Sequence, residues 1–187
     1  MNAEEAMQKL TDGNARYVVG ERKDYNFQER RLELLEGQKP FVTILTCSDS
    51  RVVPEYIFDA NIGEIFQIDT AGNVVDTVAL GSIEYGVEHL HTPILMILGH
   101  TLCGAVTACC ASSGEVVGNL GEIMKKIEPA AARKNKEVNP AIEENLRHVK
   151  ECILENSPEV KKAVDEGKVR LVLAKYLMET GEVKILE

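Results

Sequence analysis

Three short apolar runs constrain the fold of this chain more than any other feature of its sequence. They are PFVTILTC at residues 40–47, EIFQID at 64–69 and TPILMILGH at 92–100. Near-continuous apolar runs of this length are typical of strands that are buried on both faces of a sheet. Between the second and third runs, apolar side chains recur at helical spacing from Val75 to Leu90. This strand–helix–strand pattern predicts an α/β fold with a mostly parallel central sheet flanked by helices.

Most of the remaining chain is predicted to be helical. Helices are expected at 3–19, 25–36, 75–90, 104–113 and 119–135, and two further helices are expected to start at Asn139-Pro140 and Ser157-Pro158. In each of these two pairs, the first residue is read as the cap and the proline as the first helical residue. Asp76 or Thr77 is available to cap the helix that starts near Val75. The segments VRLVLAKYL and EVKIL flank Thr180-Gly181, which predicts a C-terminal strand pair. No internal repeat or long linker divides the chain, so one domain over 1–187 is expected.

Charge and cysteine content limit the classes of partner and the compartment. Asp and Glu number 30 against 21 Lys and Arg, so the net charge is −9 and neither nucleic acid nor an anionic membrane is an expected partner. The start of the chain, MNAEEAMQKL, does not resemble a secretory signal. The five cysteines are an odd number without the spacing of a disulfide framework. A cytoplasmic protein is therefore expected.

Two polar motifs follow the first and third apolar runs directly. They are CSDSR at 47–51 and GHTLCG at 99–104. In open parallel sheets, sites form where loops from the carboxyl ends of neighbouring strands meet. Two thiolates and one imidazole, from Cys47, Cys103 and His100, form a ligand set that suits zinc. Three protein ligands would leave one position of a tetrahedral ion open, which is the usual arrangement at catalytic zinc.

Asp49 and Arg51 provide a second element of this candidate site. A guanidinium can hold a carboxylate in a bidentate pair. An Asp49 that is paired in this way stays ionised and is kept from occupying the open position of the metal. It could then accept a hydrogen bond from water or hydroxide at that position.

Two other chemistries fit parts of the same motifs. In a non-enzymatic zinc protein, the metal would serve stability or partner binding, and a fourth Cys or His ligand would be expected near the site. Alternatively, Cys47 could act as a nucleophile with His100 as its base. That scheme leaves Cys103 and the paired Asp49 without a role, so metal binding explains more of the residues.

The chain also resembles a known family. CSDSRV, AGNVV, SIEYGVEHL and ILGHTLCGAV together resemble the signature of the β-class carbonic anhydrases, and the similarity extends to KLTDGNARYVVGE and YLMETGEVKIL near the two ends. The resemblance implies an α/β core at 38–187 and an N-terminal helical arm at 1–37 that packs on a partner subunit. It also implies a homodimer or higher even oligomer, with active sites at the dimer interface.

The resemblance further implies a lyase that interconverts carbon dioxide and bicarbonate by means of zinc-bound hydroxide. One Zn²⁺ per chain would be bound by Cys47, His100 and Cys103, with Asp49 and Arg51 as the catalytic pair. The residues expected to line the substrate pocket are Gln38, Phe66, Ala71 and Tyr85, and the resemblance implies that Gln38 does so from the partner subunit. A related hydrolase acting on carbon disulfide or carbonyl sulfide remains an alternative, because the ligand set does not define the substrate.

Two details refine this resemblance. Members regulated by bicarbonate often carry tryptophan three residues before the first ligand, whereas this chain has Ile44 there and no tryptophan. This favours the plant-type, constitutively open subgroup. The family usually reads Arg-Asn before Ala-Gly-Asn, whereas this chain has Asp69-Thr70, which reverses a charge near the expected site.

Overall fold

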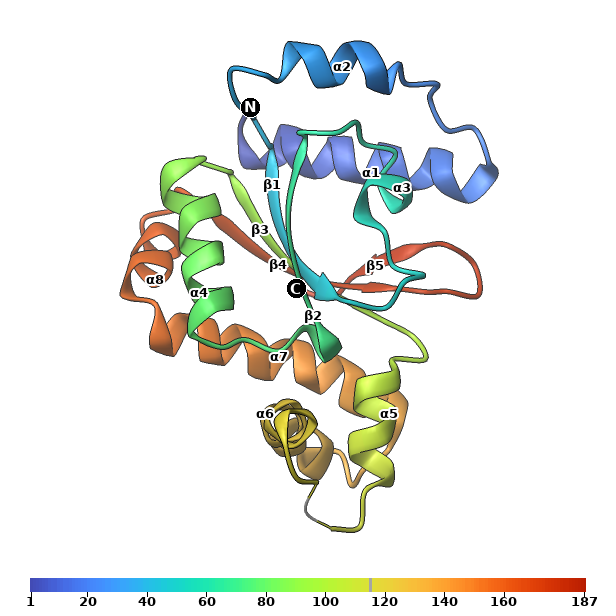
Figure 1. Ribbon diagram of the computed structural model, residues 1–187, viewed down its shortest axis with the longest axis vertical. Coiled ribbons are helices and arrows are strands. Elements are labelled where there is room, and N and C mark those ends of the chain that lie inside the picture. The colour runs from blue at the N-terminus through green and yellow to red at the C-terminus, as the bar shows by residue number, and fades with distance from the viewer. Residues whose placement is uncertain (115) are drawn as a thin grey trace.

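The computed structural model describes residues 1–114 and 116–187, and it is built around a five-stranded sheet with helices on both faces (Figure 1). The strands are β1 Val42–Cys47, β2 Ile65–Thr70, β3 Ile94–His100, β4 Arg170–Tyr176 and β5 Val183–Ile185. They lie in the order β2-β1-β3-β4-β5. β1 to β4 run parallel, and β5 pairs antiparallel with β4. The predicted fold class and the C-terminal strand pair are both confirmed.

The strand order reverses at β1. From β1 the chain moves to one side to form β2, and it then returns to the other side of β1 to form β3. Thr46 of β1 pairs in register with Leu98 of β3, so the two strands end side by side. Ligand sites in open α/β sheets form at such a reversal, outside the carboxyl ends of the strands. The two polar motifs therefore project from the edge of the sheet where a site is expected.

Each face of the sheet is covered by its own group of helices (Figure 1). One face packs against α1 Ala3–Val19 and the short α3 Pro54–Ile57. The other packs against α4 Thr77–Glu84, the π-helical turn η2 Tyr85–His89, α7 Val138–Asn156 and α8 Pro158–Asp165. Because successive side chains of a strand point to opposite faces, Ile44 joins the first apolar cluster and Leu45 the second.

A third apolar cluster lies beyond the carboxyl ends of the strands. It is formed by α5 Gly104–Ala111, α6 Asn119–Arg133 and the first part of α7, which lie together at the bottom of Figure 1. The short turn η1 Ala71–Asn73 follows β2 and contacts α5 and α6. Both Cys47 and Cys103 belong to this cluster. The candidate ligands are therefore enclosed by apolar side chains rather than held on an open loop.

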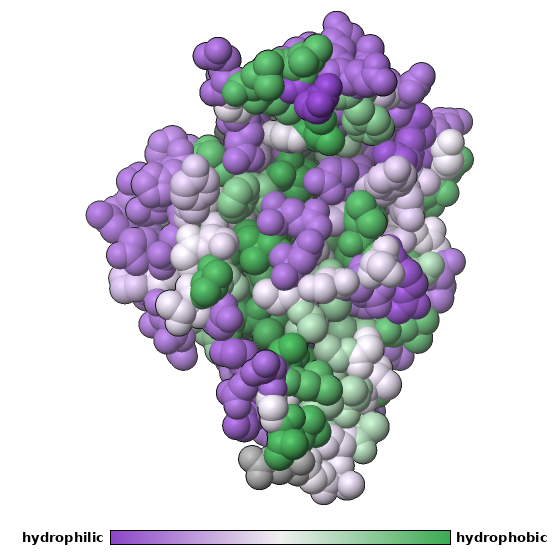
Figure 2. All heavy atoms as spheres, viewed as in Figure 1, coloured by the Kyte–Doolittle hydropathy of each residue, from purple (hydrophilic) through white to green (hydrophobic). Residues whose placement is uncertain are grey.

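The N-terminal segment forms two helices that differ in burial. α1 begins at a capping box between Asn2 and Glu5, and it buries Ala6 and Leu10 against the sheet of its own chain. α2 Phe27–Glu33 is shorter than predicted and contains no buried residue. Figure 2 shows apolar side chains on the surface over α2, where Leu32 is 59% exposed. The packing of this arm on a partner, and the division at residue 37, stay predictions.

The helix starts test the capping predictions. Ser157 caps α8 as predicted, because its hydroxyl accepts a hydrogen bond from the backbone N–H of Val160. The prediction for α7 is wrong: the helix begins at Val138, with Glu137 rather than Asn139 at the cap position. Pro140 is tolerated within the first turn, since backbone N–H groups there have no partner inside the helix.

No helix within the described ranges is both long and apolar enough to span a bilayer.

Candidate metal centre

Cys47, His100 and Cys103 converge at the carboxyl edge of the sheet. Cys47 is the last residue of β1, His100 is the last residue of β3, and Cys103 occupies the cap position of α5. Their ligand atoms all lie within 4.8 Å of one another, and all three residues are buried. In the part of the chain that the structure describes, no fourth Cys, His, Asp or Glu joins this group. The predicted convergence is confirmed, and a three-ligand set is the arrangement of a catalytic rather than a structural zinc site.

The hydrogen bonding of His100 shows that its ring is oriented as a ligand. Its Nδ1 atom lies 2.8 Å from the carbonyl oxygen of Thr101. Because a carbonyl oxygen only accepts, Nδ1 carries the proton and Nε2 presents a lone pair. Nε2 is buried and has no hydrogen-bond partner among the described residues. Metal-binding histidines usually donate their other ring N–H in this way, so the site fits a metal ion.

The two thiols influence each other strongly. The neighbouring Cys103 thiol, together with backbone N–H groups such as that of Gly72, lowers the pKa of the Cys47 thiol. The hydrogen bond with Cys47, with burial second, raises the pKa of Cys103. The two thiols thus disfavour simultaneous ionisation in the absence of a metal ion, and binding of a cation to both sulfur atoms would release protons.

The turn η1 adds a backbone donor to the site. The N–H of Gly72 donates to Sγ of Cys47 at 3.3 Å. Gly72 has a left-handed backbone (φ 67°), and a Cβ atom there would lie 2.7 Å from Cδ1 of Ile127. Only glycine meets both conditions without strain. The side chain of Asn145, on α7, donates to the Gly72 carbonyl oxygen at 2.9 Å.

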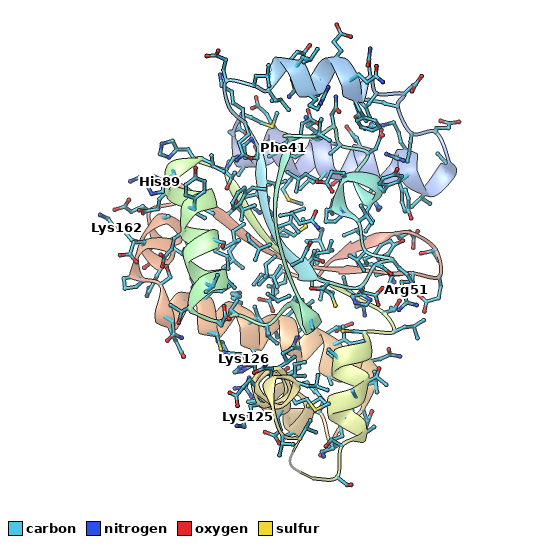
Figure 3. The ribbon with its side chains drawn as sticks, viewed as in Figure 1. Phe41, Arg51, His89, Lys125, Lys126 and Lys162 are labelled. Carbon is cyan, nitrogen blue, oxygen red and sulfur yellow. The ribbon has the colours of Figure 1, made fainter. Side chains whose placement is uncertain are left out.

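Asp49 and Arg51 form the bidentate pair that the sequence predicts. Nε of Arg51 lies 2.9 Å from Oδ1 of Asp49, and Nη2 lies 2.8 Å from Oδ2. These hydrogen bonds hold the pKa of Asp49 well below its usual range, at about 2. Arg51 lies near the carboxyl end of β1 (Figure 3), and its side chain is half-exposed while that of Asp49 is mostly buried. The carboxylate is thus ionised, fixed and turned toward Arg51.

The residues expected to line the substrate pocket do not all join this site within one chain. Ala71, in η1, lies beside Gly72 at the carboxyl edge. Phe66 pairs in register with Thr43, near the start of β1, and its ring lies 5.8 Å from that of Tyr85. Gln38 is exposed and precedes β1. Gln38, Phe66 and Tyr85 therefore lie toward the amino ends of the strands, away from the Cys and His ligands of their own chain.

Asp69 occupies the position where the resemblance predicts arginine. It lies on β2, one of the two edge strands of the sheet, one residue before the end of that strand. Both of its carboxylate oxygens accept hydrogen bonds at 2.8 Å from the side-chain amide of Gln67. The reversed charge is thus partnered by a neutral group on the same strand.

Sequence reasoning missed three groups that shape the site. These are the backbone N–H of Gly72, the side chain of Asn145 and the carbonyl oxygen of Thr101. Gly72 lies in the segment AGNVV, which carries part of the family resemblance, but nothing in the sequence indicates a role for its N–H group. Asn145 is one polar residue within a helix, and no sequence signal connects it to Gly72.

Comparison with known proteins gives consistent matches. A family model described as carbonic anhydrase matches residues 42–183. The chain is 41% identical over 129 residues to a carbonic anhydrase of Mycolicibacterium smegmatis, a match that covers 67% of this chain and 63% of that protein. It is 40% identical over 130 residues to carbonic anhydrase 2 of Mycobacterium tuberculosis, covering 67% and 62%. The chain thus spans just under two thirds of the length of these relatives.

Solved structures match over most of the chain. CafA, a β-carbonic anhydrase of Aspergillus fumigatus, is similar with a TM-score of 0.77 at 23% identity, covering 98% of this chain and 90% of that one. A tetrameric β-carbonic anhydrase of Sordaria macrospora is similar with a TM-score of 0.74 at 24% identity, covering 85% and 86%. At this level of identity the likeness establishes the fold.

Proposed function

Because the chain belongs to the β-class carbonic anhydrase family, we propose that it catalyses the reversible hydration of carbon dioxide to bicarbonate and a proton. The observation that carries this proposal is the buried group of Cys47, His100 and Cys103, with ionised Asp49 nearby. The substrate would be a small molecule, as expected for a lyase of this family. No feature of the site favours carbon disulfide or carbonyl sulfide instead.

We infer that the native cofactor is one zinc ion per chain. Cys47 and Cys103 would provide thiolate ligands, and His100 would provide Nε2. When bound, zinc acts as a Lewis acid that lowers the pKa of water far below its usual value, to about 7. Two thiolates donate more charge to the ion than two imidazoles would, and they therefore oppose this lowering of the pKa. Groups that withdraw charge from the sulfur atoms should restore part of it.

Asp49 and Arg51 have complementary roles in the proposed reaction. Oδ1 or Oδ2 of ionised Asp49 would accept a hydrogen bond from the reacting water and orient it toward carbon dioxide. Arg51 would keep Asp49 ionised and hold it away from the metal ligands, as their bidentate geometry supports. We propose on this basis that the protein is of the constitutively open, plant-type subgroup. Ile44, in place of tryptophan, supports the same proposal.

We further propose that the complete site needs two subunits. Gln38, Phe66 and Tyr85 would line the substrate pocket of the partner, because each lies away from the ligands of its own chain. The exposed apolar side of α2 would contribute to the contact between subunits as part of the N-terminal arm. A homodimer or higher even oligomer satisfies this arrangement. A cytoplasmic setting is proposed from the five cysteines, all of which are free.

Stopped-flow measurement of carbon dioxide hydration, combined with metal analysis of the same sample, tests the function. We expect about one zinc per chain, and activity that chelation or Cys47→Ser abolishes. Cys152→Ser is the matched control, because Cys152 lies on α7 outside the ligand group and should leave activity intact. A protein purified without chelators that held no metal, or that held zinc without hydrating carbon dioxide, would refute the proposal.

A further inference from the structure

The peptide groups around Gly72 connect a metal ligand to a buried amide on a distant helix. On one side, the N–H of Gly72 donates to Sγ of Cys47 at 3.3 Å. On the other side, the carbonyl oxygen of Gly72 accepts from Nδ2 of Asn145 at 2.9 Å. Asn145 is 1% exposed and lies on α7, within the packing that supports the carboxyl edge of the sheet. The two hydrogen bonds form a continuous path from helix to sulfur.

The direction of the Gly72 N–H depends on this backbone conformation. Gly72 adopts φ 67° and ψ 21°, a left-handed conformation that a flexible glycine could readily leave. The side chains of Ile127 and Ala105 confine the turn on one side. The hydrogen bond from Asn145 fixes the following carbonyl, so that rotation about Gly72 would break either this bond or the bond to sulfur.

Stability alone gives a weak reason for an asparagine at this position. Its Oδ1 atom is buried and, within residues 1–114 and 116–187, has no hydrogen-bond partner. Burying an unpaired amide oxygen is unfavourable, and an apolar side chain would avoid that cost. The hydrogen bond from Nδ2 to Gly72 is therefore the feature that distinguishes Asn145 from the apolar residues around it.

We propose that Asn145 is a positioning residue for the metal centre, holding the Gly72 N–H on the Cys47 thiolate. A hydrogen bond to a thiolate withdraws electron density from sulfur and makes it a weaker donor to a bound ion. The ion then keeps more Lewis acidity than two unmodified thiolates would allow. This inference rests on the proposed function, because it concerns the proposed metal.

Cobalt-substituted protein provides a readout that does not depend on turnover. The absorption band for charge transfer from sulfur to cobalt reports how strongly the sulfur lone pair is stabilised. In Asn145→Leu, the band should move to lower energy, because the Gly72 N–H is no longer held on Cys47. Asn145→Ala should show the same shift, which guards against an effect specific to leucine or a failure of one variant to fold. Asn139→Leu, an exposed asparagine on the same helix, is the matched control and should leave the band in place.

The pH profile of the zinc enzyme provides a second readout. The midpoint of the rise in activity should move to higher pH by up to about half a unit in both Asn145 variants, the size expected for a weakened hydrogen bond. An unchanged band and midpoint in folded Asn145 variants would overturn the inference. Loss of cobalt binding in variants that keep the wild-type circular dichroism would also overturn it, because a positioning role leaves all three ligands in place. If wild-type protein itself neither binds metal nor hydrates carbon dioxide, the proposed function fails instead.

Discussion

The pairing of Asp49 with Arg51 holds a carboxylate near the candidate metal site but outside its group of ligand atoms. Both oxygens of Asp49 accept hydrogen bonds from the Arg51 guanidinium, and Oδ1 also accepts one from the Arg51 backbone N–H at 3.0 Å. Asp49 is absent from the group of ligand atoms within 4.8 Å that the described residues form. Removal of the Arg51 guanidinium is therefore the simplest single change that could let Asp49 occupy the open position of the proposed metal.

Arg51→Ala tests this restraint. The variant frees Asp49, which we expect to bind the metal and occupy its open position, so kcat should fall at least about tenfold while zinc content persists. Stopped-flow kinetics with metal analysis measure both quantities. Arg170→Ala, at an exposed arginine that begins β4, is the control. Unchanged turnover in Arg51→Ala would exclude a gatekeeping role.

The lowered pKa of Asp49 also predicts a pH dependence of stability. A carboxyl whose folded pKa is about 2 contributes stability at pH values above its unfolded pKa of about 3.9 and loses that contribution as the pH falls toward 2. The difference in unfolding free energy between wild type and Asp49→Asn should thus be constant from pH 5 to 8 and shrink from pH 4 to 2. Urea unfolding at each pH measures it, with the exposed Asp24→Asn as the control. A difference that persisted at pH 2 would contradict the assigned pairing.

At the residue scale, the sequence predicted which three candidate ligands converge, but not the groups that hydrogen-bond to them. Cys47 and His100 end adjacent strands, and strand ends are visible as the points where apolar runs stop. Asn145 lies 73 residues from Gly72 in the sequence, and only the packing of α7 under the sheet brings them together. No local pattern encodes such a contact, because it depends on how two elements dock.

At the scale of elements, two glycines within helices differ sharply in their surroundings. A Cβ atom at Gly13 of α1 would overlap the carbonyl oxygen of Phe58, directly after α3. A Cβ atom at Gly81 of α4 would meet nothing within 4 Å. The absence of a side chain at Gly13 is thus what allows α1 to approach α3 and cover its face of the sheet.

These glycines form a matched pair of substitutions. Gly13→Ala should destabilise the protein by at least about 2 kcal/mol, because α1 must move away from backbone atoms that cannot yield. Gly81→Ala should stabilise it by about 0.5–1 kcal/mol, since alanine favours a helix and nothing obstructs it. Denaturant unfolding measures both changes. Similar effects of the two substitutions would show that the close approach at Gly13 is not a constraint.

Element types were easier to predict than element ends. The strands and most helices follow from apolar periodicity, but α7 starts before Asn139, and α2 stops at Glu33. The helix predicted from Val75 to Leu90 ends in a π-helical turn at Tyr85–His89. Side-chain packing determines such ends: Gly86 lies against Thr43 and Phe66, a contact that no pattern within the helix specifies.

For the whole molecule, the proposed site divides its residues between two chains. The candidate metal ligands lie at the carboxyl ends of the strands, whereas Gln38, Phe66 and Tyr85 lie toward the amino ends. In the proposed dimer, substitution of a candidate metal ligand should impair the site of its own chain. Substitution of Gln38, Phe66 or Tyr85 should instead impair the site of the partner. The resemblance predicted that Gln38 serves the site of the partner subunit, whereas nothing in the sequence pattern assigns Phe66 and Tyr85 to one subunit or the other.

Mixed dimers test the division. Cys47→Ser removes the metal site of its own chain, and Gln38→Ala removes a contribution to the site of the partner. Random mixing of the two chains by co-expression should restore about a quarter of wild-type activity, because half the dimers then hold one site with both groups intact. Mixing Cys47→Ser with Cys103→Ser is the control, since no dimer of that pair has an intact site. If the mixture of Cys47→Ser and Gln38→Ala were no more active than either variant alone, the result would contradict the proposal that the two subunits share their sites.

Removal of the metal should weaken the whole fold. An ion that binds only the native protein stabilises it by about 2.7 kcal/mol at a free concentration one hundred times its dissociation constant. Chelation should therefore lower the thermal unfolding midpoint of wild type and leave that of Cys47→Ser nearly unchanged, as calorimetry can show. Equal effects on both proteins would mean that the chelator acts elsewhere.

The reversal of strand order at β1 explains how a bound metal ion could stabilise the whole fold. Cys47 and His100 are separated by about 50 residues, and an unfolded chain brings such positions together only at a substantial entropic cost. They become neighbours once β1 and β3 have paired. A bound ion would then act as a reversible cross-link between the ends of two central strands, so that zinc supply would affect the stability of the fold as well as the fraction of active protein.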